Sequence, residues 1–116
     1  MLAKKLGQFG ETIAANFLRL KGYRIVERNF RTAHGELDLV CKKADQLIFV
    51  EVKTRSSQKF GYPEEAITKA KLAKLEQMAQ IYCQQNDYTR LWRLEAVSII
   101  VNLKARQFSL KHLTDL

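Results

Sequence analysis

Residues 35–55 read GELDLVCKKADQLIFVEVKTR, and this stretch decides how the chain is organised. It contains two runs rich in Leu, Val, Ile and Phe, at residues 36–42 and 47–54, with a short polar connection between them. Apolar runs bounded by polar residues at this spacing predict a β-hairpin. The connection is short enough for Ala44 and Asp45 to be its two loop residues.

With that loop, antiparallel pairing sorts the hairpin side chains by face, because residues alternate sides along a strand. One face is entirely apolar and pairs Leu37 with Val52, Leu39 with Val50 and Cys41 with Ile48. The other face pairs Val40 with Phe49, Asp38 with Glu51 and Glu36 with Lys53. A slip by one residue would send a whole apolar set to the wrong side, so the sorting supports this register.

The register brings charges of the same sign together. Asp38 and Glu51 become direct neighbours, with Lys53 two residues further along the same face. Facing carboxylates destabilise a sheet, and a divalent cation would remove that penalty. Mg²⁺ is commonly bound by one or two carboxylates plus water and phosphate oxygens. A nearby lysine can neutralise charge that develops on a phosphate.

Asp38, Glu51 and Lys53 therefore suit metal-assisted phosphodiester hydrolysis, with Mg²⁺ or Mn²⁺ as the cofactor and both carboxylates as its ligands. The alternative is a solvated sheet face on which Lys53 and Glu36 form an ordinary cross-strand pair. Val40 and Phe49 share that face, which argues that it is at least half covered and favours a functional site.

Residues 2–21 predict a helix that ends before Gly22. Its main apolar stripe is expected to consist of Leu6, Phe9, Ile13, Phe17 and Leu20. Glu11 lies instead on a second face with small or apolar neighbours, namely Gly7, Ala14, Ala15 and Leu18. Such a face can approach a sheet closely and carry Glu11 towards the acidic pair; the alternative is an exposed helix glutamate.

The rest of the chain predicts further strands and a second helix. Residues 23–30 form a strand, and the helix begins at Pro63 and runs to about Gln84. Residues 91–101, interrupted by Glu95, form a central strand, and residues 107–110 form a short edge strand. The expected order is helix, three strands, helix, then one or two strands.

The 116 residues predict one domain, 1–116, with an ordinary core at 47% hydrophobic residues. Lys and Arg number 20 against 12 Asp and Glu, and the net charge of +8 favours a polyanionic partner, nucleic acid before an anionic membrane surface. No apolar run reaches membrane-spanning length, and Cys41 and Cys83 lack metal-ligand spacing. We therefore expect a cytoplasmic protein with free thiols.

Four basic residues are the predicted contacts to a nucleic-acid backbone. Arg31 precedes the strand that contains Asp38, Arg55 and Lys59 lie in the polar loop at the end of the strand that contains Glu51 and Lys53, and Lys71 lies early in the second helix. Loops at strand ends often carry function. The alternative is a solvated linker and a merely soluble helix face.

A longer set of motifs resembles the YraN family of small bacterial proteins, within the PD-(D/E)XK nuclease superfamily. The set is Gly7-x-x-Gly10-Glu11, Gly22-Tyr23, Asn29-x-Arg31, Gly35-Glu36-Leu37-Asp38-Leu39-Val40, Phe49-Val50-Glu51-Val52-Lys53-x-Arg55 and Phe60-Gly61. One position departs from the pattern: the late strand reads Arg93-Leu94-Glu95 where Arg, an aromatic residue and Asp are expected, so Glu95 receives no role.

The resemblance implies an α/β fold with a restriction-endonuclease-like core. This is a central mixed β-sheet of about four to five strands flanked by two main helices, distantly similar to Holliday junction resolvases. It also implies that Asp38 and Glu51 hold the metal and that Lys53 assists the water or the phosphate. Glu11 would complete the catalytic cluster from the first helix.

Three functions follow from these residues. The first is a Mg²⁺-dependent endonuclease whose substrate is DNA in preference to RNA, including branched or otherwise structured DNA. Symmetric cutting of two strands would require a homodimer. The second is a nucleic-acid-binding module that keeps the fold without turnover. The third is a protein-interaction adaptor that uses an exposed sheet edge or an apolar patch.

Overall fold

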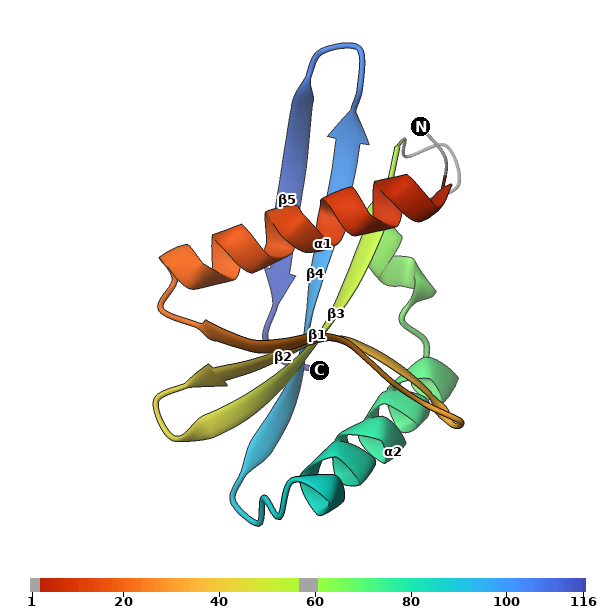
Figure 1. The fold of residues 1–116 in the computed structure, drawn as a ribbon. Coiled ribbons are helices and arrows are strands. Elements are labelled where there is room, and N and C mark those ends of the chain that lie inside the picture. Colours follow the sequence, from red (N-terminus) through yellow and green to blue (C-terminus); the bar gives the residue numbers. More distant parts are fainter. Residues whose placement is uncertain (1–2, 57–60) are drawn as a thin grey trace.

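A computed structural model describes residues 3–56 and 61–116. Five strands form one sheet in the order β1-β2-β3-β4-β5, with a helix on either side (Figure 1). The elements are α1 (Ala3–Leu20), β1 (Arg24–Thr32), β2 (Gly35–Lys43), β3 (Gln46–Arg55), the 3₁₀ helix η1 (Pro63–Ala66), α2 (Lys69–Gln85), β4 (Trp92–Asn102) and β5 (Gln107–Leu113). Neighbouring strands are antiparallel except β3 and β4, which are parallel. This mixed sheet with two main helices confirms the expected fold class.

The sheet separates two apolar cores, one beneath each helix. The α1 core contains Leu18 with Val50 and Val97, and the α2 core contains Phe49 with Met78. Alternation along the strands produces this division, because neighbouring residues of β3 point to opposite faces. Residues of β3 or β4 that are two positions apart therefore lie on the same face of the sheet.

Helix α1 packs mainly through its face of small residues, and only part of the predicted stripe contacts the core. Gly10, Ala14, Ala15 and Leu18 are its buried residues, whereas Phe9 and Leu20 are exposed. The reason is close approach: a Cβ atom added at Gly10 would lie 2.9 Å from Cβ of Thr54 on β3. The expectation that the second face approaches the sheet is confirmed. Leu6, Ile13 and Phe17 of the predicted stripe are half-buried and pack against the α1 core, so the stripe prediction is wrong only for Phe9 and Leu20.

The predicted helix from Pro63 is in fact two elements. Pro63 starts the short 3₁₀ helix η1, and α2 begins only at Lys69. Thr68 has extended backbone angles, and its hydroxyl accepts a hydrogen bond from the backbone N–H of Lys71 at 3.2 Å. This N-cap interaction starts a new helix, which explains the break.

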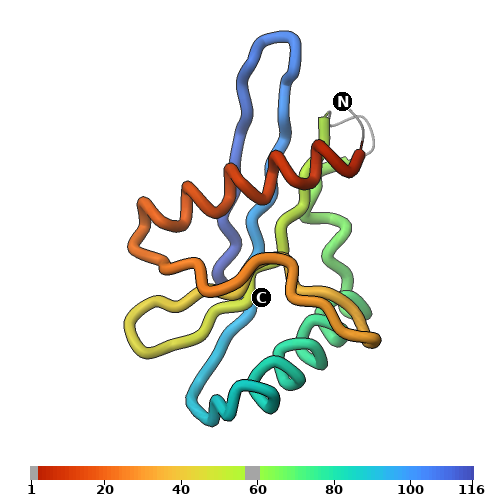
Figure 2. The backbone as a smooth tube through the Cα atoms, viewed as in Figure 1, coloured from red at the N-terminus to blue at the C-terminus, as the bar shows by residue number. Residues whose placement is uncertain are grey.

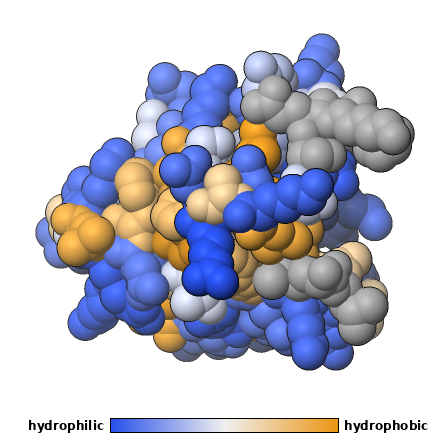
Figure 3. Space-filling model, turned by 90° about the horizontal axis from the view of Figure 1, so that it is seen from above, coloured by the Kyte–Doolittle hydropathy of each residue, from blue (hydrophilic) through white to orange (hydrophobic). Residues whose placement is uncertain are grey.

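The β4–β5 hairpin extends past α1 at one end of the molecule (Figures 1 and 2). Strand β5 is longer than the predicted 107–110, because its pairing with β4 continues to Leu113 opposite Ala96. Leu103 and Phe108 are exposed near the hairpin end. From above, hydrophilic residues cover most of the described surface, and apolar ones show between them (Figure 3). None of the described helices has the length and apolar character needed to span a membrane.

Candidate active site

The site lies where β2 separates from β3. Their ladder follows the predicted register from Lys43 opposite Gln46 to Leu39 opposite Val50, and that part of the prediction is confirmed. The ladder ends there, so the predicted pairs Leu37–Val52, Asp38–Glu51 and Glu36–Lys53 are wrong as ladder pairs. We call this point the fork.

The side chain of Asp38 produces the fork. Its Oδ2 accepts a hydrogen bond from the backbone N–H of Val52 at 2.8 Å, so a carboxylate replaces the backbone acceptor of the next rung. The outer part of the β1–β2 hairpin turns towards α2, where Leu37 joins the α2 core and Thr32 lies 3.5 Å from the sulfur of Met78. The predicted single apolar face of the hairpin is therefore divided between the two cores.

The fork holds two buried carboxyl groups close together. Asp38 is 9% exposed and Glu51 is 5% exposed. Burial first, and then a hydrogen bond to Glu51 and the charge of Glu51, raise the pKa of Asp38 to about 8, against the opposing effects of the Val52 N–H and the charge of Lys53. The predicted proximity of the two carboxyl groups is thus present, although it arises from the fork and not from cross-strand pairing.

Helix α1 brings Glu11 to the same place. The neighbouring Gly10 permits the close contact with β3, and the Glu11 carboxyl is held half-buried beside Asp38. Burial raises the pKa of Glu11 and the charge of Asp38 adds to it, while Asn29 and Arg28 oppose the shift. Among the described residues the buried Oε1 atom has no hydrogen-bond partner, and it lies 3.9 Å from Arg28 Nη2.

Lys53 lines an open groove with Glu11. The groove has a volume of about 460 Å³ and runs between the first turns of α1 and the end of β3. Its lining residues are Ala3, Leu6, Gly7, Glu11, Val52, Lys53, Thr54, Arg55 and Ser56. Lys53 is half-buried, and its charge acts on Asp38. The fork thus gathers Glu11, Asp38, Glu51 and Lys53 from three elements.

The predicted backbone contacts are placed differently from one another. Lys71 Nζ lies 3.5 Å from Glu51 Oε2, so this residue belongs to the fork itself. Arg31 is exposed and pairs with Glu36 at 2.8 Å. Arg55 is exposed at the end of β3, beside the groove, and Lys59 lies outside the described residues.

Comparison with known proteins covers most of the chain. The model of the family described as "Uncharacterised protein family UPF0102" matches residues 10–99, a range that contains Glu11, Asp38, Glu51 and Lys53. The chain belongs to the UPF0102 family. A UPF0102 protein of Caldicellulosiruptor saccharolyticus is 43% identical over 105 residues, which cover 90% of this chain and 89% of the relative.

Two further UPF0102 proteins are similar to the chain over different shares of its length. A protein of Syntrophomonas wolfei is 57% identical over 79 residues, covering 68% of this chain and 69% of the relative. One of Roseiflexus castenholzii is 40% identical over 111 residues, covering 94% and 90%. These matches confirm the YraN-like family resemblance drawn from the motifs.

In this UPF0102 chain Glu95 belongs to a separate buried network. It is 0% exposed and lies opposite Val50, on the α1 face of the sheet. Its carboxylate accepts hydrogen bonds from Tyr23 at 2.8 Å and from Arg93 at 2.7 Å, and it lies 2.7 Å from His112 Nε2. One sequence signal could have predicted this network. Arg93 stands two residues before Glu95, so both lie on the same face of an otherwise apolar strand and can form an ion pair.

The donor set at the fork fits a hard divalent cation in its chemistry. The candidate ligands are carboxylate oxygens, and Glu11 Oε1 beside them is buried with no hydrogen-bond partner in the described part of the chain. Across residues 3–56 and 61–116, no group of three or more His, Cys, Asp or Glu side chains is arranged to hold a metal ion. Asp38 and Glu51 would therefore be the protein ligands, and one or two carboxylates are what Mg²⁺ commonly uses.

Proposed function

We propose that this member of the UPF0102 family is a metal-dependent endonuclease that hydrolyses phosphodiester bonds of DNA, including branched or otherwise structured DNA. The observation that carries this proposal is the meeting of Asp38, Glu51, Glu11 and Lys53 at the fork. Buried carboxyl groups of the same charge destabilise a fold, so their retention together favours a functional role.

Each group at the fork has a role that its environment supports. Asp38 and Glu51 would hold Mg²⁺ or Mn²⁺, which supplies Lewis-acid charge and an activated water when bound. Lys53 places a positive charge beside the groove, where it can neutralise charge that develops on a phosphate. The Oε1 atom of Glu11, which accepts no hydrogen bond from the described residues, can accept one from a water molecule.

The charge of the chain favours nucleic acid as the partner. The net charge is +8, and Arg55 and Lys71 add positive charge on either side of the acidic pair. Symmetric cutting of two strands would require a homodimer. Cys41 and Cys83 are buried free thiols, which favours a reducing, cytoplasmic location.

A second candidate function rests on Lys71. Its ammonium group lies 3.5 Å from Glu51 and supplies an internal cation to the acidic pair. A fork neutralised in this way would need no metal. The alternative is therefore a nucleic-acid-binding module that keeps the fold without turnover.

A cleavage assay separates the two functions. Wild type, Asp38→Asn and the charge-matched control Glu36→Gln are incubated with linear, single-stranded and four-way-junction DNA and structured RNA, in Mg²⁺, Mn²⁺ or EDTA. The nuclease proposal predicts metal-dependent cutting of DNA that is lost in Asp38→Asn and kept in Glu36→Gln. Binding without cutting by all three proteins, unchanged in EDTA, would overturn it in favour of the binding module.

A further inference from the structure

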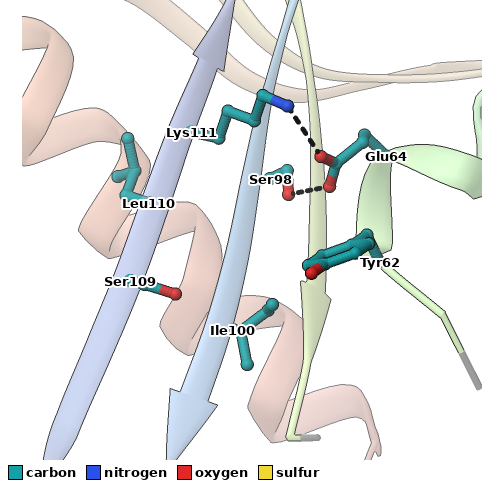
Figure 4. A pocket seen from close by; sticks show the side chains of 7 residues that line it. All are labelled: Tyr62, Glu64, Ser98, Ile100, Ser109, Leu110 and Lys111. Carbon is teal, nitrogen blue, oxygen red and sulfur yellow. Dashed lines mark hydrogen bonds and ion pairs between the residues drawn. The ribbon is translucent and has the colours of Figure 1, made fainter. Parts of the chain in front are cut away.

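A second groove lies beside the fork on the α2 face of the sheet. It has a volume of about 610 Å³ and runs between η1 and β5 (Figure 4). Its lining residues are Tyr62, Glu64, Ser98, Ile100, Ser109, Leu110 and Lys111. Ser98 and Ile100 come from β4 and form its floor, with Tyr62 and Glu64 on one side (Figure 4).

The strand register joins this groove to the candidate active site. Lys53 of β3 is the ladder partner of Ser98, and Ser98 is the ladder partner of Lys111 on β5. Arg55 is in the same way the partner of Ile100. Adjacent strands lie about 4.8 Å apart, so the row from Lys53 to Lys111 spans roughly 10 Å. That distance is more than one nucleotide step of a strand, which is about 3.4 Å in a duplex.

Two further basic residues lie on the strand next to the groove. Lys111 and Glu64 are the charged residues of its lining, and Lys53 and Arg55 lie on the neighbouring strand β3, opposite Ser98 and Ile100. Glu64 is fully occupied, because Ser98 donates to its Oε1 at 2.6 Å and Lys111 Nζ lies 3.3 Å from its Oε2. The side chain of Lys111 remains 67% exposed, so it can also contact an anion in the groove.

Tyr62 adds an aromatic surface to the groove that Lys111 lines. It is 52% exposed, and its ring lies over the groove beside Glu64 (Figure 4). Basic side chains that follow a backbone, together with an aromatic ring on which a base stacks, are the features by which proteins bind single strands. A duplex cannot use the ring in this way, because its bases are already stacked.

We propose that this groove binds a single-stranded nucleic-acid segment next to the fork, with one base on Tyr62 and phosphates on Lys111 and Arg55. The inference rests on the proposed function, since it places the unpaired part of the substrate beside the cleaved bond. It narrows the substrate class to nucleic acid with an unpaired segment, such as a junction, flap or overhang.

The test measures binding in EDTA, where no cleavage takes place, by fluorescence anisotropy of a labelled oligo-dT and of a blunt duplex. Tyr62→Ala is expected to weaken oligo-dT binding about tenfold, from the usual stacking contribution of one base. Tyr62→Phe keeps the ring and is expected to bind as wild type. Phe108→Ala removes a ring of similar exposure at the hairpin end and is the matched control.

A second variant pair addresses the phosphate contact. Lys111→Ala is expected to reduce the salt slope of oligo-dT binding by about one, the value for one lost phosphate contact, and Lys104→Ala is expected to leave it unchanged. Equal oligo-dT affinity of Tyr62→Ala and wild type would overturn the proposal, as would equal weakening by Phe108→Ala. Either of these binding results would leave the nuclease proposal standing. Absence of metal-dependent cutting, with oligo-dT binding at Tyr62 present, would overturn only the nuclease proposal.

Discussion

The carboxylate of Asp38 accepts a hydrogen bond from the backbone N–H of Val52 at 2.8 Å, just where the β2–β3 ladder stops. One side chain therefore ends the strand pairing and sits beside Glu51. The N–H of Val52 is satisfied by a carboxylate, so the strand can remain unpaired without an orphan donor. The fork is thus built from the same residue that would bind the metal.

Replacing Asp38 should stabilise the metal-free protein. Burial and the hydrogen bond and charge of Glu51 raise the pKa of Asp38 from its usual 3.8 to about 8. The folded state therefore keeps a proton that the unfolded chain loses above a pH of about 4, so stability falls as the pH rises from about 4 to about 8. Asp38→Asn should raise the free energy of unfolding near pH 8 by at most about 5 kcal/mol, the value that corresponds to the whole shift. Near pH 4 the two proteins should agree.

Urea unfolding in EDTA at these two pH values provides the measurement. Glu36→Gln is the matched control, because Glu36 is exposed on the same strand and pairs with Arg31. It should not reproduce the pH-dependent gain. A stabilisation by Asp38→Asn that is equal at both pH values would contradict the raised pKa of Asp38.

Gly10→Ala should destabilise the protein by disturbing the contact between α1 and β3. The added methyl group would collide with the Thr54 side chain, and overpacking of this kind usually costs about 1–3 kcal/mol. Gly7→Ala is the control, because an added Cβ there meets no atom within 4 Å. It should gain about 0.5–1 kcal/mol from helix propensity.

The double variant Gly10→Ala/Thr54→Ala tests the cause of that loss. Removal of the Thr54 hydroxyl and methyl groups should recover part of the stability, which gives a coupling energy in a double-mutant cycle. Additive effects of the two substitutions in thermal or urea unfolding would show that Gly10 does not act through Thr54.

The β2–β3 hairpin shows which part of the strand pairing the sequence could predict. Alternating apolar residues fixed the pairing of Leu39 with Val50 and of Cys41 with Ile48, and the structure agrees. The fork could not be predicted, because the apolar pattern does not change when a side-chain carboxylate replaces a backbone carbonyl as the hydrogen-bond acceptor. The proximity of Asp38 and Glu51 was therefore right while the assumed geometry was wrong.

The packing of α1 shows a second limit of prediction from the sequence. Hydrophobicity favoured the stripe with Phe9 and Leu20, but the sheet contacts the face of Gly10 and Ala14. The helix approaches the sheet closely only where side chains are small, and that preference outweighed apolar area. Likewise Tyr23 and His112 are distant in sequence, so their contacts with Glu95 could not be foreseen.

Glu95→Ala should destabilise the fold without acting on the fork. Removal of the carboxylate leaves Tyr23, Arg93 and His112 without their shared buried partner, a change that usually costs about 3–5 kcal/mol. Glu95→Gln should cost less, because its amide oxygen can still accept a hydrogen bond. Glu76→Ala, at an exposed site on α2, should be nearly neutral. Urea unfolding gives these values, and a neutral Glu95→Ala would contradict the account of this network.

Lys71→Met should destabilise the metal-free protein by about 1 kcal/mol, because Glu51 loses the cation 3.5 Å away. Saturating Mg²⁺ should reduce this difference, since the metal would neutralise the same carboxylate. Thermal unfolding in EDTA and in Mg²⁺ checks this, with Lys74→Met on the exposed surface of α2 as the control. A loss of the same size in both conditions would show that Lys71 and the metal do not share Glu51.

The measurement that tests the central claim most directly is Mn²⁺ binding, followed by the electron paramagnetic resonance signal of the free ion. The account predicts that wild type and Glu36→Gln take up Mn²⁺, that Mg²⁺ competes for the same site, and that Asp38→Asn and Glu51→Gln lose this binding. Folding of both variants is verified by circular dichroism. Absence of Mn²⁺ uptake by wild type, or equal uptake by Asp38→Asn, would contradict a metal site at the fork.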